Sequence, residues 1–290
     1  MKPKRIKYSR FDYPYSSLPT TRKEAFKDVY RHNFRTILYS GLILFLFALP
    51  IIIFTIVMEV GKMGMTLEYY SQEQLHDVLM LWDIIINVGV VFLLFIFLIG
   101  LSGIIRILRL LIWQQGISFG HDFKRGIKEN YPILALLMGI FATIYLATYF
   151  IQLFLLQFII GLTLIIIYLL LFVSTYLWSI FMVAVYQTNL GTYIRNSFFF
   201  FGKTIGWTIL FAILISLPFI SYYLYFISIS GTLLFIILKE VFIAILLVFF
   251  YPMLLIVGLL YSCSKFDKYI NEENYPDYFR RGLYQPKNIK

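Results

Sequence analysis

A run of 65 residues, from position 130 to position 194, contains no Lys, Arg, Asp or Glu. Glu129 and Arg195 are the charged residues on either side of it. As a single straight helix the run would be ~100 Å long at about 1.5 Å per residue, whereas the hydrocarbon core of a bilayer is about 30 Å thick. The run must therefore fold back on itself, and the sequence predicts a membrane-embedded hairpin of two helices.

Long apolar runs predict an all-α, multi-pass membrane protein with six transmembrane helices. In chain order these helices are expected at about Ile37–Met58, Leu81–Ile104, Pro132–Leu155, Phe158–Tyr186, Ile205–Ile227 and Val241–Ser262. The hairpin turn is expected near Gln152, Gln157 and Gly161. Residues 1–36 then form a basic N-terminal tail, residues 37–262 the membrane domain, and residues 263–290 a C-terminal tail.

The basic residues are distributed unevenly across this topology. Of the 25 Lys and Arg residues, all except Lys62 and Lys239 fall in the two tails and in the loops after the second and fourth helices. The positive-inside rule therefore predicts that both termini are cytoplasmic. The opposite side carries six acids, namely Glu59, Glu68, Glu73, Asp77, Asp83 and Glu240. Lys239 and Glu240 are expected at the outer entrance of the last helix, because charges at mid-bilayer are costly.

A capping box is expected to begin the N-terminal helix, with Thr21 as the N-cap and Glu24 as its N3 partner. Ala25, Val29 and Phe34 then fall roughly on one side of a helix that is otherwise rich in basic residues. This pattern is typical of a juxtamembrane amphipathic helix on an anionic inner leaflet. Docking of the helix onto a partner protein is the alternative.

The loop after the second helix carries an apolar stripe. Phe119, Phe123 and Ile127 recur every four residues, and the charged residues of the segment fall off this stripe. The spacing predicts a short helix that lies flat at the inner membrane surface. The loop after the fourth helix, from Asn196 to Lys203, also mixes aromatic and basic residues.

These two loops hold the candidate contacts with a partner protein or with the membrane surface. Ten residues are assigned to them: Phe119, Asp122, Phe123, Arg125, Ile127, Lys128, Asn130, Arg195, Asn196 and Lys203. A second set of candidates lies within the spans, where Asn87, Tyr145, Tyr149, Tyr168 and Tyr176 are polar. They either bridge packed helices or line a sugar or lipid site through ring stacking and hydroxyl contacts.

The chain offers little for catalysis or metal binding. Its three histidines lie in different segments, and it has a single cysteine, so the ligand clusters that a metal site needs are missing. Ser118, His121 and Asp122 are better explained as a helix start than as a catalytic triad. We therefore expect no catalytic residue, no metal ligand and no cofactor.

Close helix packing explains two pairs of glycines, and membrane-flanking basic residues explain the net charge. Gly100 with Gly103, and Gly202 with Gly206, are expected where helices pack closely. The net charge of +10 comes from basic blocks between apolar spans, which indicates membrane flanks and not a nucleic-acid partner.

Three stretches resemble the YesL-like family of uncharacterised bacterial integral membrane proteins. They are Leu46–Ile51 with its central Leu-Pro, the basic helix end and following segment Arg106–Asn130, and the aromatic cluster of Asn196–Leu210. The family is associated with carbohydrate uptake by ABC transporters. The resemblance therefore implies an accessory membrane protein, and it supplies no catalytic residues.

The sequence predicts a non-enzymatic membrane accessory or scaffold protein, in the setting of a carbohydrate ABC transport system. The alternative is a permease or permease subunit that moves a small neutral solute. Expected partners are the anionic inner leaflet and other membrane or cytoplasmic subunits, with an ATPase subunit only if the chain is part of a transporter.

Overall fold

The computed structural model describes residues 2–3, 18–65, 72–155, 163–164, 167–215 and 233–284. Its long helices are α1 (Arg22–Met65), α2 (Gln72–Ile112) and α3 (Phe119–Leu155). Shorter elements follow: η2 (Leu169–Val173), α5 (Ser174–Val185), α6 (Leu190–Lys203), α8 (Leu233–Ile245), η3 (Leu246–Phe250), α9 (Tyr251–Phe266), η4 (Asp267–Asn271), α10 (Glu272–Asn274) and η5 (Pro276–Tyr278). Lys2–Pro3 (β1) pairs with Tyr186–Gln187 (β2) as a two-residue antiparallel bridge.

Four helices are long and apolar enough to cross a membrane. They cover Arg22–Lys62, Asp77–Ile112, Phe119–Ile151 and Ile236–Asn274, and they include the first, second, third and sixth predicted spans. A fifth crossing is possible by length if α6 and the helix Ile205–Ile215, bent by 108°, count as one broken span. Leu171–Val185, within the predicted fourth span, is a shorter apolar helix. The chain is thus a multi-pass helical membrane protein; the predicted turn at Gln157 and Gly161 lies outside the described residues.

The outer surface of the long helices is apolar. On α1 the exposed side chains include Leu42, Leu46, Ile53 and Val57, which follow helical spacing along one face. Similar exposed aliphatic and aromatic side chains occur on α2, α3 and α8. An apolar face of this length is suited to lipid, because lipid makes no hydrogen bonds to side chains.

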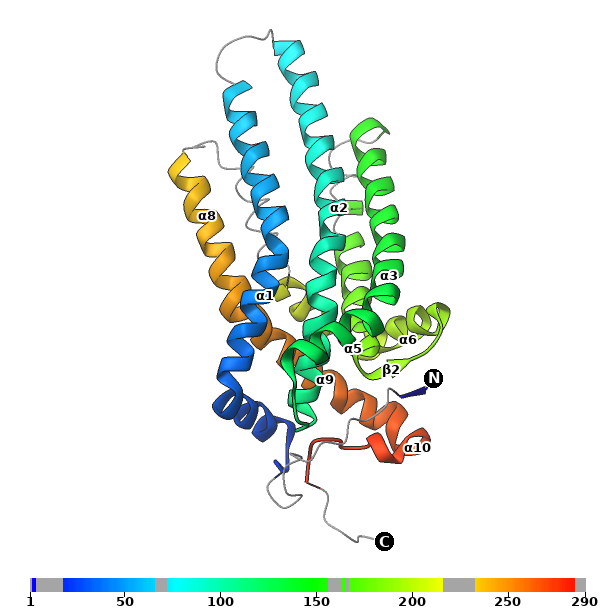
Figure 1. Ribbon diagram of the computed structural model, residues 1–290. Helices are drawn as coiled ribbons and strands as arrows, with labels where there is room; N and C mark the ends of the chain where they lie inside the picture. Colours follow the sequence, from blue (N-terminus) through cyan, green and yellow to red (C-terminus); the bar gives the residue numbers. More distant parts are fainter. Residues whose placement is uncertain are drawn as a thin grey trace.

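The core surrounds α5. Every residue of α5 except Tyr176 is buried, and a helix that is apolar on all sides is the expected centre of a bundle. Figure 1 shows α1, α2 and α3 running alongside one another, the α8–α9 helix crossing them obliquely, and α6 lying near the end that holds both chain termini. We call this end of the bundle the terminal end.

The N-terminal capping box is confirmed. Thr21 Oγ1 accepts a hydrogen bond from Glu24 N, and Glu24 Oε2 accepts from Thr21 N and Thr20 N. A kink at Asn33 (φ −122°, ψ 23°) separates this first part of α1 from the apolar part. Ala25 and Val29 are fully buried, so this part of the apolar face packs against the protein itself, whereas Phe34, beyond the kink, is exposed.

A π-helical turn interrupts the last long helix. Pro252 has no N–H and cannot donate to the carbonyl of Val248 four residues earlier, and the π-turn η3 lies immediately before it. Gly41 of α1 sits against this freed carbonyl, since a Cβ on Gly41 would lie 1.9 Å from Val248 O. The two helix backbones therefore meet at a point where only glycine fits.

Replacing Gly41 with Ala is expected to destabilise the protein by about 1–3 kcal/mol, because α1 must move away from η3. The measurement is the free energy of unfolding by SDS titration in mixed micelles. Gly64 is the matched control, since a Cβ there would meet no atom within 4 Å. Gly64→Ala should be neutral or stabilising, by up to about 1 kcal/mol. Equal effects of the two substitutions would contradict the proposed contact.

Other glycines test the close-packing prediction. A Cβ on Gly100 would meet the Phe47 ring, and a Cβ on Gly103 would meet the Phe123 ring, so that prediction is confirmed for this pair. For Gly202 and Gly206 it is wrong, because a Cβ on either would meet no atom within 4 Å.

Candidate functional site

The first polar cluster at the terminal end centres on Arg106 of α2. Its guanidinium forms ion pairs with Glu129 at 2.6 Å and with Asp122 at 3.7 Å. Asp122 is completely buried, and its Oδ2 also accepts a hydrogen bond of 2.8 Å from Ser118 N. The predicted start of a helix at Ser118 is therefore confirmed, and Asp122 joins that helix start to α2.

The apolar stripe of the same segment faces the protein. Phe119 contacts the ring of Tyr39, with centroids 6.5 Å apart, and Phe123 contacts that of Phe47 at 6.2 Å. The segment forms the first turns of α3, which continues without interruption to Leu155. The prediction of a separate helix lying flat at the membrane surface is thus wrong, because α1 and α2 cover the stripe. Ile127, on the same stripe, is half-buried.

Arg109 connects α2 to the end of α5. It lies buried one helical turn beyond Arg106 and donates a 2.7 Å hydrogen bond to the carbonyl of Ala184. Helix ends leave their last carbonyls without partners, so Arg109 satisfies one such group of α5. Its guanidinium also lies 4.9 Å from the centroid of the Trp113 ring. Another hydrogen bond joins α3 to α2, since buried Asn130 donates to the carbonyl of Ser102 at 2.8 Å.

A second polar cluster connects α5, the C-terminal segment and the N-terminus. Tyr186 donates to Asn271 Oδ1 at 2.6 Å, and Asn271 donates to Asp267 Oδ1 at 2.9 Å. Arg22 donates to Asp267 Oδ2 at 2.6 Å. This chain of contacts crosses three segments that are far apart in the sequence.

The chain ends are joined by hydrogen bonds to backbone carbonyls. Tyr284 N donates to the carbonyl of Pro19 at 2.8 Å, and the Arg22 guanidinium donates to the carbonyl of Arg281 at 2.9 Å. Gly282, with φ +79°, lies against the last turn of α2. Residues 263–284, within the predicted C-terminal tail, are therefore folded onto the bundle.

The predicted loop after the fourth helix is instead mostly helix α6. Asn189 caps it, since its side chain accepts from Thr192 N at 2.9 Å. Tyr193, Ser197 and Phe200 are buried. The opposite face is exposed and carries Arg195, Phe198, Phe199, Gly202 and Lys203; this set is called the α6 outer face. Asn196 lies between the two faces and is half-buried.

The α6 outer face combines exposed aromatic rings with basic groups. Lys203 Nζ lies 5.9 Å from the centroid of the Phe199 ring, and Trp207 is exposed just beyond the bend. Aromatic and basic side chains together are typical of the membrane–water interface. The sequence pattern alone indicates Arg195 and Lys203, whereas the exposure of Phe198 depends on the helix orientation.

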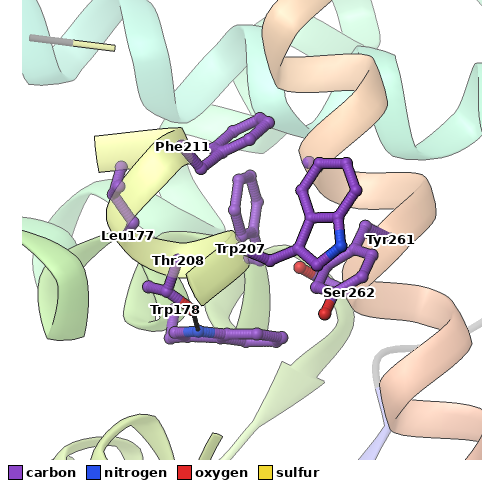
Figure 2. Close-up of a pocket in the computed structure, with 9 residues that line it drawn as sticks. Leu177, Trp178, Trp207, Thr208, Phe211, Tyr261 and Ser262 are labelled. Atoms are coloured by element: carbon purple, nitrogen blue, oxygen red, sulfur yellow. Dashed lines mark hydrogen bonds between the residues drawn. The ribbon is translucent and has the colours of Figure 1, made fainter. Parts of the chain in front are cut away.

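A small cavity lies behind the bend. Its volume is about 20 Å³, and its lining includes Leu177, Trp178, Trp207, Thr208, Phe211, Tyr261 and Ser262. Figure 2 shows the rings gathered around it and the 2.9 Å hydrogen bond from Trp178 Nε1 to Thr208 Oγ1. A cavity of this size holds about one water molecule, so it is too small for a sugar.

Asn87, Tyr145 and Tyr168, within the spans, hydrogen-bond to one another or to the backbone. Tyr145 donates to Asn87 Oδ1 at 2.6 Å, and its ring lies 5.5 Å from that of Tyr168 and 6.4 Å from that of Tyr149. Tyr168 donates to the carbonyl of Phe141 at 2.9 Å. These four residues meet, whereas Tyr176 packs separately beside Phe141. Hydroxyls used in this way join helices.

Comparison of the chain with family models, with curated proteins and with solved structures found no match. The resemblance to the YesL-like family therefore stays a prediction. Among the described residues no cluster of three or more His, Cys, Asp or Glu has a geometry that could hold a metal ion.

Proposed function

We propose that this protein is a six-span, non-enzymatic accessory or scaffold protein of a bacterial plasma membrane, with both termini cytoplasmic. Contact between the two chain ends supports an even number of crossings, since Tyr284 hydrogen-bonds to Pro19. The basic residues concentrated in the tails and in two loops support a cytoplasmic location for that end. A carbohydrate ABC transport system is the proposed setting, on the basis of the family resemblance.

The main support for this proposal is the network of hydrogen bonds and ion pairs at the terminal end. Buried and partly buried hydrogen bonds and ion pairs join α1, α2, α3, α5 and the C-terminal segment there, through residues such as Arg22, Arg106, Arg109 and Asp267. Segments that are joined in this way can present a fixed polar surface to other subunits. The α6 outer face lies beside it and offers charged and aromatic side chains suited to an interface.

The test compares two double charge reversals at the terminal end. Arg195→Glu with Lys203→Glu changes the α6 outer face, and Lys23→Glu with Lys27→Glu makes the same charge change at exposed positions of α1. Chains that copurify with the tagged protein from native membranes are then quantified by mass spectrometry. The α6 variant should recover at least about tenfold less of the partner subunits, which corresponds to ~1.4 kcal/mol. Equal recovery from both variants would reject docking at α6.

Cysteine labelling tests the topology independently. With the buried Cys263 replaced by Ser, a single cysteine at position 70 should react with impermeant reagent from the outside, and one at position 273 only from the cytoplasm. Labelling of both positions from the same side would reject the proposed topology.

A permease or permease subunit for a small neutral solute is the second candidate. It is favoured by the meeting of Asn87, Tyr145, Tyr149 and Tyr168 among the apolar helices. Uptake of neutral sugars into proteoliposomes, with the chain alone or with an added ATPase, tests it. Correctly inserted protein that moves none of them would exclude this candidate for those solutes.

A further inference from the structure

Three buried charged residues meet at the end of the bundle opposite the chain termini. Glu59 of α1 is 3% exposed, and Lys239 and Glu240 of α8 are each 7% exposed. Lys239 Nζ forms an ion pair with Glu59 Oε1 and lies 3.2 Å from Glu240 Oε1. The sequence predicts the Lys239–Glu240 pair at the outer entrance of the last helix, and the structure adds that the pair is buried against α1. These three residues are called the charged triad.

The charges of the triad do not balance. One ammonium faces two carboxylates, which leaves a net charge of −1 when all three groups are ionised. Among the described residues, Lys62 of α1 and Asp83 of α2 form an ion pair with each other at 2.9 Å. Residues 241–264, which continue the helix of Lys239, contain no charged residue. Residues 216–232, which precede α8 in the sequence and lie outside the described part, contain none either.

The hydrogen bonds of the triad are also incomplete. Glu59 Oε2 and both carboxyl oxygens of Glu240 are buried without a hydrogen-bond partner. An ionised carboxylate buried in apolar surroundings without hydrogen bonds is strongly disfavoured, and such a group takes up a proton instead. A protonated carboxyl group is neutral, and it removes the excess charge without any further ligand.

We infer that the charged triad is a proton-binding site, which holds one exchangeable proton at neutral pH with Glu240 as its main carrier. Lys239 directs its closest contact to Glu59, so these two form the neutral ion pair. Glu240 is left with the longer contact and without a hydrogen bond. The ammonium occupies the space between the two carboxyl groups, so a metal cation would meet a like charge there.

The site controls the contact between α1 and α8. With the proton bound, the triad is neutral and the two helices pack without electrostatic penalty. Loss of the proton leaves one negative charge buried between them, which favours separation of the helices or entry of water. The pH on this side of the protein is therefore expected to change the α1–α8 contact, whereas the terminal end stays unaffected.

Infrared spectroscopy of the full-length protein in lipid nanodiscs tests the proton count at neutral pH. The wild type should show the C=O band of one protonated carboxyl group. Glu240→Gln and Glu59→Gln should each abolish the band, because one ammonium then faces one carboxylate. Lys239→Met should double it, since two carboxyl groups lose their counter-charge. Glu273→Gln, at an exposed position on α10, is the control and should leave the band unchanged.

The pH dependence of unfolding is a second, independent test. Because an unfolded Glu is ionised at neutral pH, the folded wild type binds one more proton than the unfolded chain. Its unfolding equilibrium constant should therefore rise about tenfold per pH unit relative to that of Glu240→Gln.

Two results would overturn the inference. One is a wild type without the protonated-carboxyl band, or a band that both Gln variants retain. The other is stabilisation of the wild type, and not of Glu240→Gln, by Na⁺ or K⁺, which would identify the ligand as a cation.

Discussion

Replacing Lys239 with Met is expected to destabilise the protein by about 3–5 kcal/mol, because Glu59 and Glu240 then remain buried without a counter-charge. Lys239 is the only basic side chain that the described residues bring into contact with Glu59. The loss should shrink as the pH falls, since the folded variant must bind one proton more than the folded wild type and a lower pH favours this uptake. The free energy of unfolding, measured by SDS titration in mixed micelles at several pH values, checks both statements.

A double variant separates the charge effect from a packing effect. Glu59→Leu combined with Lys239→Met removes the ion pair as a whole, and such apolar replacements are often neutral or stabilising. The double variant should therefore recover most of the stability that Lys239→Met loses. If it is at least as unstable as the single variant, the shape of the lysine side chain and not its charge is what the site requires.

Replacing Arg106 with Met should have the second large effect, again about 3–5 kcal/mol. Arg106 is the counter-charge of completely buried Asp122 and also contacts Glu129. Without it, the start of α3 separates from α2, and the rings of Phe119 and Phe123 lose their support against α1. The unfolding free energy and protease resistance of residues 113–130 report this change.

Arg125 provides a matched control within the same cluster. It binds the same carboxylate, Glu129, at 2.7 Å, but its side chain is 43% exposed, whereas that of Arg106 is 3% exposed. An exposed ion pair contributes at most about 1 kcal/mol, so Arg125→Met should change stability by no more than that. Similar losses for Arg106→Met and Arg125→Met would show that burial does not distinguish the two arginines.

Local patterns are sufficient to predict much of the fold. The capping box at Thr21 and the long apolar helices depend on residues close together in the sequence, and the structure contains both. The same holds for the helix start at Ser118. In each of these cases the spacing of residues within one segment determines the structure.

Contacts between segments far apart in the sequence determine which surface covers an apolar helix face and which residue pairs with a buried charge. The spacing of Phe119, Phe123 and Ile127 indicates a helix with an apolar face, but it does not say whether protein or lipid covers that face. The burial of Lys239 does not follow from the local pattern for a similar reason, because its partner, Glu59, is 180 residues away in the sequence. Lys239 and Glu240 stand out in the sequence as two charged residues in an otherwise apolar helix. Only the packing of α1 on α8 identifies Glu59 as the partner of Lys239.

The π-turn at Leu246–Phe250 has a consequence for the whole molecule. A π-turn accommodates one more residue than an α-turn, and one residue of an α-helix corresponds to a rotation of about 100°. Every side chain after the turn is therefore rotated about the helix axis relative to an unbroken α-helix. Lys239 before it pairs with Glu59 of α1, and Asp267 after it pairs with Arg22 of α1, at opposite ends of the molecule. Deleting one residue from this turn would keep both side chains in the sequence but rotate one relative to the other by about 100° about the helix axis. One of the two ion pairs with α1 would then be lost, so the π-turn fixes the relative orientation of the two ends of this helix.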